Sequence, residues 1–177
     1  MINRVVIALA ALALATPAHA QATVDPEHIA ALLKDAGYPT EFVGEQAGYR
    51  QILTKSGDYD FSVELYDCNA GKACELLLLR TTFRKSDSVT KEAVDAYSSQ
   101  QPQGRMFLDR RGNPAIELEF DLTKSSLTDA QFTDALKSWD TMLVNYAGFL
   151  RGDTPPAPAA AAAAGNAAPA PSSGGAS

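Results

Sequence analysis

Residues 58–83, with the sequence DYDFSVELYDCNAGKACELLLLRTTF, contain the pattern that decides the fold of this chain. From Tyr59 to Tyr66, apolar and polar residues alternate, which is the period of a β-strand with one buried and one wet face. From Glu75 to Phe83, four consecutive leucines put apolar side chains on both faces of a second strand. The turn-like residues between these two segments predict a hairpin, and therefore an antiparallel sheet.

Residues 1–20 have the three parts of a secretory signal peptide. A short segment with Arg4 precedes an apolar run from Val5 to Ala15, and the small residues Ala18-His19-Ala20 form a cleavage site ahead of Gln21. A membrane anchor is the weaker alternative, because the apolar run rises only about 16 Å as a helix, roughly half of a bilayer core. We expect cleavage near Ala20 and export to the periplasm or medium, without insertion into the membrane.

The composition between the two ends is that of one globular domain. The chain has 177 residues and is 46% hydrophobic, and we place the domain at residues 26–150. Residues 151–177 are rich in Ala, Pro, Gly and Ser, so we expect a disordered tail, with a tether to the cell envelope as the alternative. The formal net charge of −6 argues against nucleic acid as a partner, because an acidic surface repels phosphates.

Export also determines what we expect of Cys68 and Cys74. An even pair of cysteines in an oxidising compartment forms a disulfide by default, and closing so short a loop stabilises the fold by about 2 kcal/mol. The alternative is a redox or metal pair. The spacing is not that of a C-x-x-C motif, and two thiols without a nearby histidine make a poor zinc site.

Three helices and further strands surround the central hairpin. Asp25-Pro26 caps a first helix, Ser88 caps a second helix over Val89–Ser99, and the capping box Thr128–Gln131 starts a third helix that carries an apolar stripe to Leu150. Weaker patterns predict short strands around Phe42 and Ile52, and a hairpin of Arg105–Asp109 with Ala115–Leu122. The order of elements favours an α+β fold in which helices pack on an antiparallel sheet.

The strand with four leucines raises the question of what covers its second face. If Leu77 and Leu79 join the core, Leu76 and Leu78 project from the opposite face. A helix of the same chain, a second copy or a protein or peptide partner could lie there. Nearby arginines would suit an acidic or extended peptide, although they also serve as local counterions. The candidate partner interface comprises Leu76, Leu78, Arg80, Phe107, Arg110 and Arg111.

Catalytic interpretations find little support in the sequence. After cleavage only His28 remains among the histidines, and no G-x-S-x-G motif is present. The acidic strand positions Glu117, Glu119 and Asp121 could act as acid and base or hold a cation, which makes a hydrolase or a cation-binding protein the alternative function. A wet strand face is the simpler interpretation. We therefore predict no catalytic residue, no metal site and no cofactor.

Four stretches of the chain resemble the YbjN-domain family, in the exported form found in proteobacteria. They are LKDAGY at 33–38, VELYDC at 63–68 with Cys74, RMFLD at 105–109 with Gly112-Asn113-Pro114, and residues 132–139. The resemblance implies a fold like that of type III secretion chaperones, in the order α-β-β-β-α-β-β-α, together with dimerisation and a sensory or regulatory role without established chemistry. Two positions differ from the family pattern, namely Tyr97-Ser98, where it has Trp-Asn, and Arg110-Arg111, where its turn is acidic.

These observations together predict a function. We expect an exported, non-catalytic binding or chaperone-like regulatory module of the bacterial envelope. Its partner would be a protein or peptide, and a second copy of this chain is one such partner.

Overall fold

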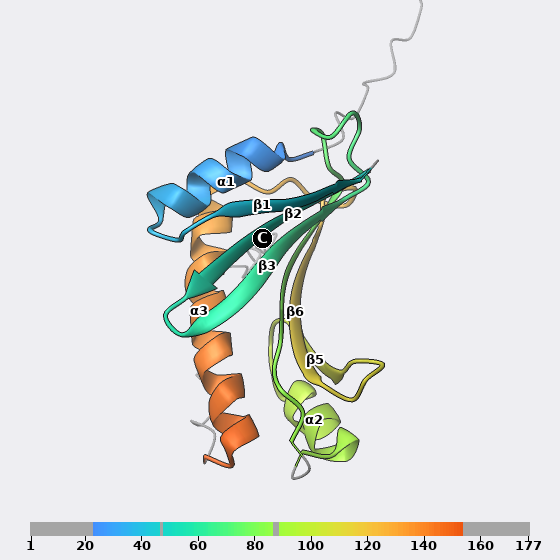
Figure 1. Cartoon of the computed structure of the whole chain (residues 1–177), viewed down its shortest axis with the longest axis vertical. Coiled ribbons are helices and arrows are strands. Elements are labelled where there is room, and N and C mark those ends of the chain that lie inside the picture. The colour runs from blue at the N-terminus through green and yellow to red at the C-terminus, as the bar shows by residue number, and fades with distance from the viewer. Residues whose placement is uncertain (1–22, 47, 87–88, 154–177) are drawn as a thin grey trace, which may run out of the picture.

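The computed structural model describes residues 23–46, 48–86 and 89–153 (Figure 1). The predicted signal peptide and almost all of the predicted tail lie outside these residues. The described residues form three helices and six strands, which is the predicted α+β class. In chain order the elements are α1 (Pro26–Asp35), β1 (Glu41–Gln46), β2 (Tyr49–Ser56), β3 (Tyr59–Tyr66), β4 (Leu76–Thr82), α2 (Lys91–Ser98), β5 (Arg105–Leu108), β6 (Pro114–Asp121) and α3 (Asp129–Arg151).

The six strands form one antiparallel sheet in the order β1-β2-β3-β4-β6-β5. The predicted hairpin of β3 and β4 lies at its centre, with Val63 opposite Leu79 and Leu65 opposite Leu77. The resemblance implied three strands before the middle helix, but the structure has four. The additional strand is β1, which pairs with the outer edge of β2 and confirms the weak strand pattern around Phe42.

Two of the three helices begin at the capping residues that the sequence predicted. The Asp25 side chain accepts a hydrogen bond from the Glu27 amide, and the predicted capping box of Thr128 and Gln131 is present. The second helix begins later than predicted. Its cap is Thr90, whose side chain accepts a hydrogen bond from the Ala93 amide in the first turn of the helix. The predicted cap, Ser88, lies outside the described residues.

The hydrophobic core lies between the sheet and the helices α1 and α3. The stripe of α3 is buried as predicted: Trp139 packs on Phe61 of β3 with ring centroids 5.6 Å apart, and Tyr146 meets Phe83 at 5.5 Å. Helix α2 closes one end of this layer, where Tyr97 stacks on Phe149 at 4.4 Å. No helix among the described residues is long and apolar enough to cross a membrane.

The predicted disulfide between Cys68 and Cys74 is present, with an S–S distance of 2.03 Å. It closes the loop between β3 and β4, in which Ala70 and Gly71 adopt left-handed backbone angles and Asn69 pairs with Ala73. The backbone of Cys74 also exchanges hydrogen bonds with Val24, just before α1. The disulfide loop therefore ties the central hairpin to the start of the first helix.

Candidate functional site

The two faces of the sheet have different surroundings. Helices α1 and α3 pack on one face, and no helix of the described part of the chain lies on the other, which we call the open face (Figure 1). Strand β4 shows the difference within one element, because Leu77 and Leu79 are fully buried in the core while Leu76 and Leu78 are half-buried on the open face. The predicted outward orientation of these two leucines is confirmed.

The open face is organised in rows of directly paired residues. Paired residues in neighbouring strands project to the same side of a sheet, so the register gives the neighbours on this face. One row crosses all six strands, through Glu41, Leu53, Ser62, Arg80, Glu117 and Arg105. The next contains Gln51, Glu64, Leu78 and Glu119, and the third contains Tyr49, Tyr66, Leu76 and Asp121.

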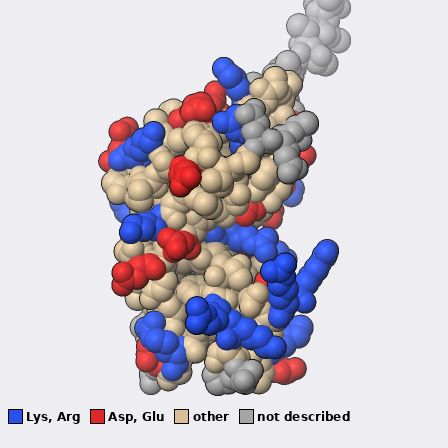
Figure 2. All heavy atoms as spheres, in the orientation of Figure 1, with Lys and Arg blue, Asp and Glu red and all other residues tan. Residues whose placement is uncertain are grey.

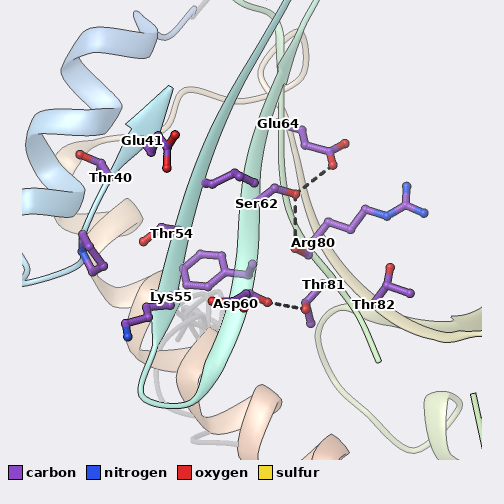
Figure 3. Close-up of a pocket in the computed structure, with 13 residues that line it drawn as sticks. Thr40, Glu41, Thr54, Lys55, Asp60, Ser62, Glu64, Arg80, Thr81 and Thr82 are labelled. Atoms are coloured by element: carbon purple, nitrogen blue, oxygen red, sulfur yellow. Dashed lines mark hydrogen bonds between the residues drawn. The ribbon is translucent and has the colours of Figure 1, made fainter. Parts of the chain in front are cut away.

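A groove of about 770 Å³ lies over the β1–β4 part of the open face. The chain at 39–41, just before and at the start of β1, forms one wall, and residues 80–82 of β4 form the other. Figure 3 shows that Ser62, Glu64, Arg80 and Thr82 project to the same side of β3 and β4. The groove therefore combines apolar surface, from Leu53, with side chains of both charges.

A shared carboxylate organises the charges beside this groove. Glu117 on β6 is only 7% exposed, and its two oxygens lie 3.1 Å from an Arg80 nitrogen and 2.6 Å from an Arg105 nitrogen. Both guanidinium groups also lie over the Phe107 ring, at 5.7 Å and 4.8 Å from its centroid. Two positive charges share one negative charge, so this cluster, which we call the arginine pair, carries a positive surplus.

A second carboxylate, Glu64, is held in a different way. It is 8% exposed and accepts hydrogen bonds from the Tyr66 hydroxyl at 2.5 Å and the Ser62 hydroxyl at 2.9 Å. Burial, with the bond to Glu64, raises the pKa of Tyr66, and burial with the charge of Glu64 raises the pKa of Tyr49, whose ring lies 4.9 Å from that of Tyr66. These tyrosines therefore keep their protons at neutral pH, and the Tyr66 hydroxyl remains a donor to the carboxylate.

The structure brings together most of the predicted interface. Leu76, Leu78, Arg80 and Phe107 share the open face, whereas Arg110 and Arg111 lie exposed in the turn between β5 and β6. Lys and Arg side chains gather on the right of the view in Figure 2, at the level of this hairpin in Figure 1.

Sequence reasoning missed Arg105, Glu64 and Tyr66 as members of this surface. The alternation of β3 already placed Glu64 and Tyr66 on the outward face, and it could have identified them. The pairing of Arg105 with Glu117 depends on strand register, which the sequence pattern does not contain.

The acidic residues of β6 project to one side as predicted, but they do not act as one group. Glu117 is buried and paired, which corrects the expectation of a wet strand face there, because two arginines from neighbouring strands cover it. Glu119 is exposed, and hydrogen bonds from Lys124 and Thr123 lower the pKa of Asp121. Within the described ranges, no group of three or more His, Cys, Asp or Glu side chains could hold a metal ion.

His28, Tyr97 and Ser98 lie away from the open face and contact neighbouring helices and strands. His28 is exposed in the first turn of α1, with its Nε2 2.8 Å from an Asp129 oxygen at the start of α3. Tyr97 belongs to the aromatic stack of α2 and α3, and the Ser98 hydroxyl accepts a hydrogen bond from the Met106 amide. The two positions that differ from the family pattern in the middle helix therefore join α2 to its neighbours.

The described residues form a small α+β domain in which helices pack on one face of the sheet and no helix lies on the other. The chain belongs to the YbjN family, whose model matches residues 25–151 and is described as "Putative bacterial sensory transduction regulator". This description is that of a regulator and not of an enzyme. A search of the curated proteins found no match, and a search of the solved structures found none either.

Proposed function

We propose that this protein is an exported, non-catalytic regulatory module that binds a protein or peptide partner through the open face of its sheet. The observation that carries the proposal is the composition of that face. Half-buried Leu78 lies two residues along β4 from Arg80 of the arginine pair, with Leu76 two residues further, and a groove of about 770 Å³ lies on the same face, while the opposite face is packed by helices. A partly apolar sheet face on which none of the described helices packs is a candidate docking surface.

The proposal rests on the surface and not on reactive chemistry. The buried carboxylates of the open face are engaged, Glu117 by two arginines and Glu64 by two hydroxyls. Such contacts hold side chains in fixed positions for recognition, and the regulatory description of the family agrees with this role. The alternative of a hydrolase or cation site on β6 has no observation in its favour.

Export is part of the proposal and is supported by the sequence of residues 1–20. The expected mature protein begins at Gln21, after a small-residue cleavage site. N-terminal sequencing of the protein purified from a bacterial periplasm tests this directly. Recovery of an uncleaved chain from the cytoplasm alone would contradict it.

Site-specific photocrosslinking in bacterial cells tests the binding role. A photoreactive phenylalanine replaces Phe107 on the open face and, as a matched control, Val144, which is 57% exposed on α3. We expect position 107 to give a discrete adduct that disappears in a Leu78→Asp background, and position 144 to give none. Mass spectrometry then identifies the adduct, and light scattering in solution tells a second copy of this chain from a different partner.

Two results would overturn the proposal. Equal, diffuse crosslinking from positions 107 and 144 would mean that the open face has no preferred partner. A discrete adduct at 107 that survives Leu78→Asp would place the contact elsewhere.

A further inference from the structure

We infer that the open face recognises an acidic, extended peptide segment of its partner, with a carboxylate of the segment bound between Arg80 and Arg105. This inference rests on the proposed function, because it names the chemistry of the partner that the open face would bind. It depends on the positions of the arginine pair, Phe107 and Leu78.

Glu117 holds both guanidinium groups in place and neutralises only one of their two charges. The Arg105 side chain remains 70% exposed and that of Arg80 34% exposed, so both retain donors that face solvent. A planar guanidinium with free donors matches a carboxylate in geometry and charge. A second carboxylate can therefore join the cluster and bring it to neutrality.

Arg80 and Leu78 are two residues apart on β4 and project to the same side. Their separation along the strand is about 7 Å, which is also the distance between residues i and i+2 of any extended peptide. A peptide that lies along β4 can place an acidic side chain at Arg80 and an apolar one at Leu78. The face thus favours segments with an acidic and an apolar residue two positions apart.

Away from the arginine pair, the open face carries more carboxylates than cations, with Glu41, Asp60, Glu64 and Glu119 against Lys55, which is paired with Asp60. A nucleic-acid backbone or an anionic membrane would present many negative charges and would meet these carboxylates as well. A peptide can place a single carboxylate at the arginines and avoid the others. The mixture of charges therefore favours a peptide.

The experiment selects binders from a random 12-residue phage-displayed peptide library with the mature full chain as the target. Enriched peptides are synthesised with a fluorescent label and their affinities are measured by anisotropy. We expect acidic sequences with an apolar residue two positions from the acid, and weaker binding as salt rises. Loss of the charge-assisted contact in Arg105→Gln should weaken binding about tenfold or more.

Matched variants make the result specific. Arg105→Lys keeps the charge without the planar fork and should be intermediate. Glu119→Gln removes a repelling carboxylate from the neighbouring row and should strengthen binding, while Lys137→Gln, the same loss of charge as Arg105→Gln but on the exposed side of α3, should leave it unchanged. Circular dichroism melting of each variant confirms that the fold is retained.

Several outcomes would overturn the inference. Neutral or basic peptides that lose affinity in Leu78→Asp but not in Arg105→Gln would refute the acidic partner and leave the proposed function standing. Arg105-dependent binding of an oligothymidylate or of phosphatidylglycerol vesicles, in place of peptides, would assign the site to another class of ligand. Enrichment of no peptide that depends on Leu78 or Arg105 would refute the inference, and absence of the position-107 crosslink as well would refute the proposed function.

Discussion

The helix-covered face and the open face of this sheet are built from the same strands, yet they bury different kinds of side chain. On the covered face, apolar side chains such as Leu77 and Leu79 are completely buried beneath α1 and α3. On the open face, the most buried side chains include two glutamates, Glu64 and Glu117. Each glutamate has hydrogen-bonding or ion-pair partners, so the open face is polar and its buried carboxylates are held in place.

This difference shows that a sheet face without helices need not be an ordinary wet surface. A carboxylate that loses water must gain hydrogen bonds or an ion pair, and both glutamates do. The apolar part of the open face, at Leu76 and Leu78, is only half-buried. Recognition would use this combination of fixed charges and uncovered leucines.

The largest expected effect compares neighbouring leucines on the two faces. Leu77→Ala opens a cavity in the core and should lower the free energy of unfolding by about 2–5 kcal/mol. Leu76→Ala removes the same atoms from a half-buried position and should cost less than about 1.5 kcal/mol. Urea denaturation of both variants measures the difference, and equal losses would mean that the open face is core.

The second prediction concerns the disulfide, which serves both faces because it closes the loop between β3 and β4. Its removal in a Cys68→Ser, Cys74→Ser double variant should lower the free energy of unfolding by about 2 kcal/mol. The contrast between Leu77→Ala and Leu76→Ala should persist in this background. If the contrast vanished, the register of the two strands would depend on the disulfide.

The third prediction tests whether Glu117 belongs to the fixed part of the open face. Glu117→Gln leaves Arg80 and Arg105 side by side without their shared carboxylate, and should lower stability by about 1–2 kcal/mol. Glu119→Gln on the same strand changes an exposed side chain and should have an effect within about 0.5 kcal/mol. Thermal melting of the two variants compares them, and indistinguishable curves would return Glu117 to the class of wet strand residues.

The smallest effect concerns Tyr66. Glu64→Gln removes the negative charge that helps raise the pKa of Tyr66, so that pKa should fall toward the ordinary value of about 10. A raised pKa in the folded state favours the protonated hydroxyl, so its contribution to stability is present below about pH 10 and is lost as the pH rises through the folded-state pKa. An NMR titration that follows the ring signals of Tyr66 gives the difference, because Glu64 also raises the pKa of Tyr49 and absorbance would report both tyrosines together. A Tyr66 titration unchanged by the substitution would show that Glu64 does not hold the hydroxyl.

The sequence predicted the faces of the sheet well wherever a strand had a regular period. The alternation from Tyr59 to Tyr66 and the four leucines of β4 predicted the inward residues correctly, and the capping box at Thr128 predicted the start of α3. These features are local, so a pattern along the chain contains them. The expected wet face of β3 was wrong at Ser62 and Glu64, which are buried because they hydrogen-bond to each other.

Contacts between distant strands could not be predicted in this way. The burial of Glu117 depends on the order β4-β6-β5, which brings Arg80 and Arg105 to either side of it. The residue pattern did indicate four strands before α2, but the one around Phe42 was weak, because β1 is an edge strand that pairs only with β2. Register and strand order are properties of the whole sheet, and the periodicity of one segment does not specify them.

The most direct test of the central claim compares Leu78→Asp with Leu79→Asp, adjacent residues on opposite faces of β4. Thermal melting is measured for both variants, and the photocrosslink at position 107 is assayed separately in each. We predict that Leu79→Asp fails to fold, whereas Leu78→Asp still folds and loses the crosslink, with a melting temperature lowered only by the repulsion between the new carboxylate and its neighbours Glu64 and Glu119. A Leu78→Asp protein that unfolds like Leu79→Asp, or that folds and keeps the crosslink, would contradict the assignment of the open face as a binding surface.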